Sequence, residues 1–246
     1  MMFSLEGKAA LVTGANTGLG QGISLALAGA GADIVGVSRS DLSETKKKIE
    51  ALGRKFFAIT ADLADSAAPK MIMQKAGSVD ILVNNAGTII REDAVNCSEE
   101  AWDTVLDVNL KSAFFLSQEM AKQLFARNAK GKIINIASML SYSGGIRVPA
   151  YTASKSGIVG ITKALANEWA AKGINVNAIA PGYMITNNTK DLYNDAQRSQ
   201  QILQRIPAGR WGTPEDLGGT AVFLASQASD YLHGFTIAVD GGWLAR

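Results

Sequence analysis

The sequence predicts an α/β protein built on a doubly wound parallel sheet of about seven strands, with helices on both faces. Short apolar runs rich in Val, Ile and Ala alternate along the 246 residues with longer helical patterns. Most of these runs are apolar on both faces, as strands covered on both sides must be. No linker, low-complexity tract or internal repeat interrupts the alternation, so residues 1–246 are expected to form a single domain.

Each expected strand is a short run that ends at turn residues, and each expected helix is a longer stretch between two such runs. The expected strands are Ala9–Thr13, Asp33–Val37, Lys55–Thr60, Ile81–Asn84, Lys132–Ala137, Asn175–Ala180 and Phe235–Val239. The expected helices are Gly20–Ala30, Ser43–Leu52, Glu99–Phe125, Thr152–Lys172 and Pro214–Ala225. Strands that alternate with helices imply right-handed crossovers between parallel strands.

Charge and composition exclude several classes of protein. The 24 basic and 22 acidic side chains leave a formal charge of +2, which offers no field for a nucleic acid partner. The single cysteine, Cys97, and the single histidine, His233, exclude a disulfide framework and the common zinc sites, so no metal is expected. No apolar run approaches the roughly 18 residues of a membrane span, and the first residues lack a signal-peptide layout. We therefore expect a cytoplasmic protein that does not bind membranes.

A glycine-rich turn, Thr13 to Gly20, follows the first expected strand. Gly14 permits the unusual dihedral angles of a tight turn. Gly18 and Gly20 remove side chains where a pyrophosphate must touch the backbone and where the helix must pack on the strand. The free N–H groups at the helix start then face the anion. A merely tight loop is the alternative, but the position after the first strand favours a Rossmann-type dinucleotide site.

The ends of the next strands carry side chains suited to the adenosine half of a dinucleotide. The second strand leads into Ser38 and Arg39, where an acidic residue would hold the ribose 2′-hydroxyl and repel a 2′-phosphate. Ser38 cannot repel a phosphate and Arg39 can pair with one, so NADP is permitted and slightly favoured; an arginine stacked on adenine is the alternative. Asp62 and Leu63 follow the third strand, where a carboxylate can accept from the adenine amino group. The segment Asn84–Gly87 suggests backbone held by amide side chains beside a ligand.

Three further side chains fit proton transfer beside a hydride acceptor. Ser138 ends the fifth expected strand, and Tyr151 and Lys155 share one face of the helix that follows. A phenol with a pKa near 10 is a poor base, but a neighbouring ammonium and a nicotinamide cation both favour the phenolate. Lowering that pKa by about 3 units takes about 4 kcal/mol. Ser138 can donate to the substrate oxygen, and Asn109 can bend its helix and hold a water that relays protons to Lys155.

A Tyr-x3-Lys pair alone occurs by chance on amphipathic helices. The ordered set of glycine turn, Asn-Asn-Ala-Gly, Asn109, Ser138 and Tyr151 with Lys155 is far more specific. On that set the chain resembles the short-chain dehydrogenase/reductase family over essentially its whole length. The resemblance implies that Asn109, Ser138, Tyr151 and Lys155 form the catalytic tetrad. It also implies a dinucleotide bound by Gly14, Asn16, Thr17, Gly18, Leu19, Gly20, Ser38, Arg39, Asp62, Leu63, Asn85, Ala86, Gly87, Tyr151, Lys155, Pro181, Gly182, Met184 and Thr186.

Within the family, the resemblance extends to members that act on deoxy-keto sugar acids of the 2-dehydro-3-deoxy-D-gluconate or 2-deoxy-D-gluconate type, from uronate or pectin breakdown. The strings that carry it are Thr17–Gly22, Arg91–Asp93, Ser138–Ser141, Gly144–Pro149, Asn187–Thr189 and Trp243–Arg246. That subgroup is regarded as NAD-linked, against Ser38 and Arg39, so NAD and NADP both stay open. The resemblance implies a homotetramer. The segment from Asp62 to Asp80, which contains Pro69, is shorter than in typical members.

The expected substrate contacts are Ser138, Tyr151 and Arg147. Arg147 lies four residues before Tyr151 and can pair with a sugar-acid carboxylate through two hydrogen bonds; Arg91 is a second candidate. Surface or subunit contacts are the alternative for both arginines. A 3-oxoacyl thioester reductase shares the tetrad and is the rival enzyme. A regulator that senses the dinucleotide without chemistry is the rival of another class, although it needs no complete tetrad.

Overall fold

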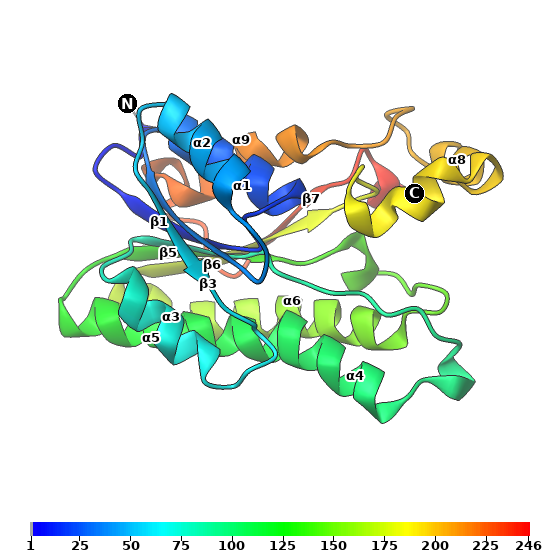
Figure 1. The fold of residues 1–246 in the computed structure, drawn as a ribbon, viewed down its shortest axis with the longest axis horizontal. Coiled ribbons are helices and arrows are strands. Elements are labelled where there is room, and N and C mark those ends of the chain that lie inside the picture. The colour runs from blue at the N-terminus through cyan, green and yellow to red at the C-terminus, as the bar shows by residue number, and fades with distance from the viewer. Residues whose placement is uncertain (1) are drawn as a thin grey trace.

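The structure is a computed structural model, and it describes residues 2–246. Seven parallel strands form one sheet in the order β3-β2-β1-β4-β5-β6-β7 (Figure 1). The predicted α/β fold with a doubly wound parallel sheet is therefore confirmed. The strands are β1 Ala9–Thr13, β2 Asp33–Ser38, β3 Phe56–Thr60, β4 Ile81–Asn84, β5 Gly131–Ile136, β6 Ile174–Pro181 and β7 Thr236–Val239.

Helices cover both faces of the sheet, with α1, α2 and α9 on one side and α3 to α6 on the other (Figure 1). Strand β1 shows why both faces must be covered: Ala10 and Val12 join the core beneath α1 and α9, whereas Leu11 joins the core beneath α3 and α5. The helices are α1 Gly18–Gly29, α2 Ser43–Ala51, α3 Ala68–Ala76, α4 Glu99–Leu106, α5 Ser112–Ala126, α6 Pro149–Trp169, α7 Lys190–Asn194, α8 Ala196–Leu203 and α9 Gly218–Ala225.

Every predicted strand is present, within one residue at each end. The helices differ more. The predicted helix Glu99–Phe125 is divided into α4 and α5 by a π-helical turn, Asp107–Lys111, and the predicted helix Pro214–Ala225 begins as a 3₁₀ turn, Pro214–Leu217. Three helices, α3, α7 and α8, were not predicted. All three are short, and α3 has Pro69 in its first turn, a position that suits proline although this residue is usually taken as a helix breaker.

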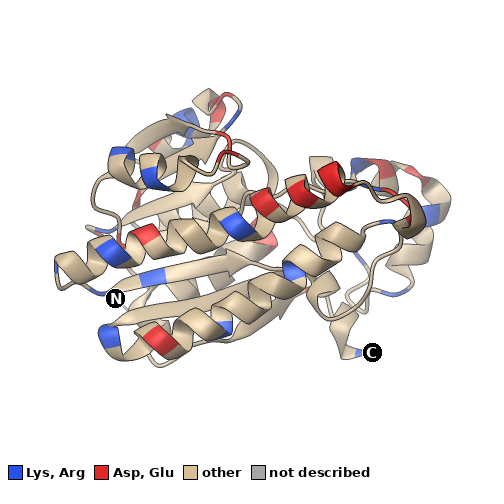
Figure 2. Cartoon of the chain, turned by 90° about the horizontal axis from the view of Figure 1, so that it is seen from below, with Lys and Arg blue, Asp and Glu red and all other residues tan. Residues whose placement is uncertain are grey.

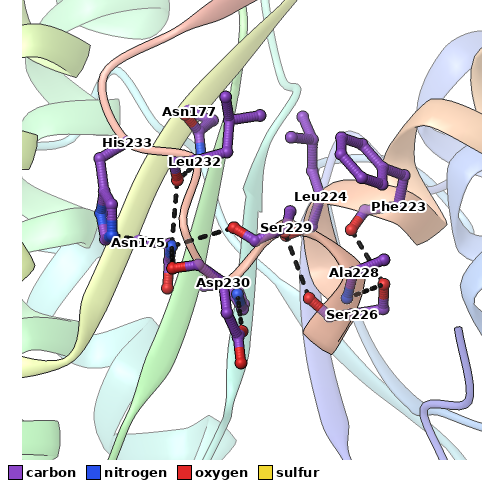
Figure 3. A network of polar contacts seen from close by, with 11 residues as sticks. Asn175, Asn177, Phe223, Leu224, Ser226, Ala228, Ser229, Asp230, Leu232 and His233 are labelled. Carbon is purple, nitrogen blue, oxygen red and sulfur yellow. Dashed lines mark hydrogen bonds and ion pairs between the residues drawn. The ribbon is translucent and has the colours of Figure 1, made fainter. Parts of the chain in front are cut away.

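The last strand is fastened to the sheet by asparagine side chains of β6 (Figure 3). The Asn175 amide nitrogen lies 3.0 Å from the carbonyl oxygens of both Asp230 and Leu232. Asn177 donates to the Leu232 carbonyl at 2.8 Å and accepts from the Phe235 N–H at 3.0 Å. These bonds satisfy backbone groups in the loop that leads from α9, so β7 enters the sheet in a defined register.

The helical layer of α4, α5 and α6 carries scattered charges and some exposed apolar side chains. Seen from below, acidic residues gather at α4, which contains Glu99 and Glu100, and charges of both signs are spread along the rest (Figure 2). Trp102, Phe115 and Phe125 each leave about two fifths of their surface exposed. Within residues 2–246, no helix is long and apolar enough to cross a membrane.

Candidate active site

The glycine turn forms a cradle at the carboxyl ends of β1 and β4, where the strand order reverses and α/β sheets bind ligands. Gly14 and Gly18 adopt φ angles of +66° and +55°, which L side chains rarely adopt. A Cβ on Gly20 would collide with the Gly14 carbonyl oxygen. Helix α1 begins at Gly18, and its N-cap residue Thr17 makes no side-chain cap, so the first N–H groups are left for an anion. This arrangement fits the pyrophosphate of a dinucleotide.

The turn is held in place by the end of β4. The Thr13 hydroxyl accepts from the N–H groups of Asn85 and Ala86 at 3.0 and 2.9 Å. The Asn85 amide donates back to the Thr13 carbonyl at 2.8 Å. The expectation that amide side chains hold this backbone therefore fits the geometry of Asn85. Asn84 instead points to the other face of the sheet, where it donates to Asn135.

Two open cavities share Gly14, Asn16, Ala86 and Gly87 and so form one cleft. The first encloses about 630 Å³ and contains the predicted adenosine residues Ser38, Arg39, Asp62 and Leu63. The second encloses about 980 Å³ and contains the predicted residues Asn16, Thr17, Gly18, Leu19, Gly20, Asn85, Ala86, Gly87, Ser138, Tyr151, Lys155, Pro181, Gly182, Met184 and Thr186. All predicted cofactor residues thus line one cleft.

In the adenosine cavity, Arg39 does not point freely into solvent. Its guanidinium lies 3.7 Å from the Asp62 carboxylate, and both side chains are more than half exposed. The Ser38 hydroxyl accepts from the Ser40 N–H at 3.0 Å. A serine and a cation therefore lie together at the end of β2, as the sequence predicted for a site that tolerates a 2′-phosphate.

Ser138 is fixed at the end of β5 by a reciprocal cap. Its hydroxyl accepts from the Leu140 N–H at 3.1 Å, and its own N–H donates to the Ser141 hydroxyl at 3.3 Å. Ser141 in turn donates to the Lys155 carbonyl of α6 at 2.7 Å. The Ser138 hydroxyl also lies close enough to the Tyr151 phenol to lower its pKa. The loop after β5 and the helix α6 are thus joined where the two predicted catalytic hydroxyls meet.

Lys155 is a buried cation at the floor of the second cavity. It is 4% exposed, and its Nζ donates to the Ile136 carbonyl at 2.7 Å. Nζ lies 5.7 Å from the centre of the Tyr151 ring. Burial lowers the pKa of this ammonium from 10.5 to about 8, because a low-dielectric site disfavours the charged form. Gly87 leaves room here, since a Cβ on it would lie 3.7 Å from Nζ.

The sequence predicts a lowered pKa for the Tyr151 phenol, but the protein's own groups together raise it. Burial raises the pKa of Tyr151, while the hydrogen bond from Ser138 and the charge of Arg91 lower it less. Burial is the largest effect because a low-dielectric site disfavours the phenolate, as it disfavours the Lys155 ammonium. Without coenzyme the phenol is therefore a weaker acid than an exposed tyrosine, and the positive charge of an oxidised nicotinamide would favour the phenolate.

Asn109 lies in the π-helical turn, 2% exposed, behind the cavity rather than in its wall. Its amide nitrogen donates to the Thr88 carbonyl at 2.9 Å and to the Ser154 hydroxyl at 3.1 Å, and its oxygen accepts from the Thr88 N–H at 2.8 Å. Both amide hydrogens are therefore used by protein groups. Ser154 donates on to the Tyr151 carbonyl at 2.8 Å, so the side chain braces the catalytic helix.

The two arginines considered for the substrate lie in different surroundings. Arg147 is 57% exposed, forms an ion pair with Asp93 at 3.1 Å and does not line the cleft. Arg91 donates to the Asn188 carbonyl at 2.9 Å, and Asn188 lines the second cavity. The Arg91 charge also acts on Tyr151. Arg91 therefore contacts a residue of the cleft wall without lining the cleft itself, whereas Arg147 pairs with Asp93.

The segment that closes the second cavity rests on the end of the chain. Gly182 donates from its N–H to the Val239 carbonyl at 3.0 Å, and a Cβ on Gly182 would lie 2.6 Å from Asp240 Cα. Tyr183 packs edge-on against Trp243, with ring centres 4.9 Å apart. Other wall residues that were not predicted are Ile136, Ala137, Asn187, Asn188 and Thr189. The sequence links Asn187–Thr189 to the family by resemblance alone. A polar loop has no periodicity from which its position in the cavity wall could be predicted.

Known proteins share both the sequence and the fold of this chain. A family model described as enoyl-(acyl carrier protein) reductase matches residues 14–244. The chain is 61% identical over 248 residues to the 2-dehydro-3-deoxy-D-gluconate 5-dehydrogenase of Dickeya dadantii (strain 3937), covering 99% of this chain and 98% of that one. The chain belongs to the short-chain dehydrogenase/reductase family. The enzyme of the same description from Bacillus subtilis (strain 168) is 58% identical, with 99% and 97% covered.

A solved structure of this family superposes closely. It is described as a 2-deoxy-D-gluconate 3-dehydrogenase from Agrobacterium tumefaciens with bound NADP; it is 60% identical, the TM-score is 0.97, and 100% of this chain and 99% of that chain are covered. Members of the short-chain dehydrogenase/reductase family are NAD(P)-dependent oxidoreductases. The predictions of family, fold and class of cofactor are therefore confirmed.

Proposed function

We propose that the chain, acting as one dinucleotide-binding catalytic domain, interconverts a secondary alcohol and a ketone on a deoxy-keto sugar acid. The substrate class is that of 2-dehydro-3-deoxy-D-gluconate and 2-deoxy-D-gluconate, met in uronate or pectin breakdown. The observation that carries this is the 61% identity with the Dickeya dadantii enzyme over the full chain. A cleft lined by all the predicted cofactor residues supports it.

In the proposed reaction, the protein's groups manage the proton while the nicotinamide, when bound, accepts the hydride. Tyr151 takes the hydroxyl proton of the alcohol, and Ser138 donates a hydrogen bond to the same oxygen as its charge changes. Lys155 supplies a buried positive charge near the phenol. Its ammonium would also donate hydrogen bonds to the hydroxyls of the nicotinamide ribose. Asn109 braces α6 through Ser154, and its one remaining acceptor position is where a relay water would bind. The reverse reaction uses the same groups.

Recognition of the substrate carboxylate is proposed for Arg91. This is supported by its hydrogen bond to the carbonyl of Asn188, a residue that lines the second cavity. Arg147, the first candidate from the sequence, is engaged with Asp93 outside the cleft. A guanidinium binds a carboxylate through two parallel hydrogen bonds, which also orients the sugar chain toward Tyr151.

The proposed coenzyme is either NAD or NADP. Arg39 can pair with a 2′-phosphate, which favours NADP, but its neighbour Asp62 competes for the same guanidinium. The proposed site therefore discriminates weakly between the two coenzymes.

The proposed assembly is a cytoplasmic homotetramer. The exposed aromatic side chains Trp102, Phe115 and Phe125 on the α4–α5 layer support burial against a second copy. Sedimentation equilibrium would measure the mass; a monomer at micromolar concentration would contradict the assembly without affecting the proposed reaction.

The decisive test is a steady-state screen of sugar acids with each nicotinamide in turn. We expect turnover with the deoxy-keto sugar acids above. A matched assay with an acetoacetyl thioester tests the rival 3-oxoacyl reductase. Higher kcat/KM with the thioester, or no turnover with any sugar acid, would refute the proposed substrate class.

A further inference from the structure

A line of buried polar side chains crosses the face of the sheet that α5 and α6 cover, behind the active site. Asn84 ends β4 and pairs in register with Asn135 of β5. The Asn84 side-chain amide donates to Oδ1 of Asn135 at 2.8 Å, and the Asn135 side-chain amide donates to the Thr162 hydroxyl of α6 at 2.9 Å. Asn84 is 5% exposed and the other two residues are fully buried. One side chain, Asn135, therefore connects two strands with the helix that carries Tyr151 and Lys155.

The surroundings of this line are apolar. Ile133 of β5 and Leu165 and Ala166 of α6 belong to the core cluster on this face. Burying polar groups here costs free energy that their hydrogen bonds at best offset, and apolar side chains of similar size often stabilise a fold as well or better. Stability alone is therefore a poor reason for an asparagine at position 135, and the geometry that it imposes is a better one.

Asn135 is connected to Lys155 in two ways, through β5 and through α6. Ile136 directly follows Asn135, and its carbonyl oxygen is the acceptor for Lys155 Nζ at 2.7 Å. Thr162 lies seven residues after Lys155, two turns along the same face of α6. The bond from Asn135 to Thr162 therefore opposes sliding of α6 along β5, which would separate Lys155 from Ile136.

We propose that Asn135 is a positioning residue for the reaction, which with Thr162 fixes the register of α6 against β5 and so places Lys155 and Tyr151 relative to Ser138. Asn84 extends the same bracing to β4, whose next residue holds the cofactor turn. The inference rests on the catalytic roles proposed above, because it states how those groups are held in place.

Two substitutions of Thr162 form a matched pair. Thr162→Val removes the hydroxyl but keeps the shape, whereas Thr162→Ser keeps the hydroxyl. Because small misplacements of catalytic groups cost up to about 100-fold in rate, we expect Thr162→Val to lower kcat about tenfold. The KM for coenzyme should stay within about twofold, since the glycine cradle is untouched. Thr162→Ser should keep kcat within about twofold of the parent enzyme.

The pH profile gives a readout that a merely structural role would not move. In Thr162→Val the ammonium of Lys155 is less well placed near Tyr151, so the phenolate is less favoured. The apparent pKa on the acidic side of the kcat/KM profile for alcohol oxidation should therefore rise. In Thr162→Ser it should match the parent enzyme.

The double variant Asn135→Leu with Thr162→Val separates positioning from stability. It leaves no unpaired partner at either position, and Asn84 keeps its contacts with the Ser117 hydroxyl at 3.0 Å and the Ala113 carbonyl at 3.3 Å. We expect a Tm at or above that of Thr162→Val, with kcat still about tenfold low.

Recovery of kcat together with Tm in the double variant would overturn the inference, as would a Thr162→Val enzyme with parental kcat and pH profile. A parent enzyme without turnover on any sugar acid would overturn the proposed function itself. The two failures are therefore distinguishable.

Discussion

Replacing Lys155 by methionine should abolish turnover and yet make the chain more stable at neutral pH. Burial lowers the pKa of the ammonium from 10.5 to about 8. At 1.36 kcal/mol for each pKa unit, holding this charge in the folded state at pH 7 costs about 3 kcal/mol. Methionine removes that cost but also the hydrogen bond to Ile136, which is worth about 1–2 kcal/mol. The expected net gain in the free energy of unfolding is about 1–2 kcal/mol.

The pH dependence of this gain tests the reasoning. Below pH 8, Lys155 is protonated in the folded and unfolded states alike, so the full cost is present. Between about pH 8 and 10.5 the folded state has lost its proton while the unfolded state still holds one, and the cost disappears. Urea unfolding of both proteins should therefore show the methionine variant ahead at pH 7 and level or behind at pH 10.

A matched control is available on the same helix. Lys163 of α6 is exposed, so Lys163→Met should change stability little at either pH. The reasoning is refuted if Lys155→Met is less stable than the parent at pH 7 and its stability varies with pH as the parent's does.

Three further outcomes are expected. Tyr151→Phe should abolish turnover while coenzyme affinity, measured by fluorescence titration, stays within a few-fold; retained turnover would contradict the assigned base. Arg91→Ala should raise the KM for the sugar acid about tenfold or more at constant coenzyme KM, whereas Arg147→Ala should leave both within twofold; the reverse pattern in steady-state kinetics would restore Arg147 as the substrate contact. Arg39→Ala should lower kcat/KM for NADP relative to NAD about tenfold, and an unchanged ratio would exclude that guanidinium from coenzyme selection.

The strands and the cleft were predictable because their physical signals are local. The run Ala9 to Val12 is apolar on both faces, and this pattern favours a parallel strand covered on both sides. Parallel strands bring their carboxyl ends to one edge, so the residues after β1, β4 and β5 had to meet once the sheet order reversed.

What sequence spacing could not predict was the direction of individual side chains. Arg147 is near Tyr151 along the chain, but it adopts a φ of +63° on an exposed loop and turns to Asp93. Arg91 is sixty positions before Tyr151, yet it contacts the carbonyl of Asn188 in the wall of the second cavity. Similarly, Asn84 and Asn85 are adjacent, and the alternation of a strand sends them to opposite faces. The pKa of Tyr151 depends on burial, which no motif records.

The support of Tyr183 and Gly182 by the final residues has a practical consequence for making the protein. Arg246 donates to the Gln204 carbonyl at 2.6 Å, so even the last side chain is engaged next to α8. In Figure 1 the mark for the N-terminus lies on the opposite side of the molecule from the mark for the C-terminus. Affinity tags and fusion partners are therefore better attached on the N-terminal side, because an extension at Arg246 would follow directly on residues that support the wall of the proposed catalytic cavity.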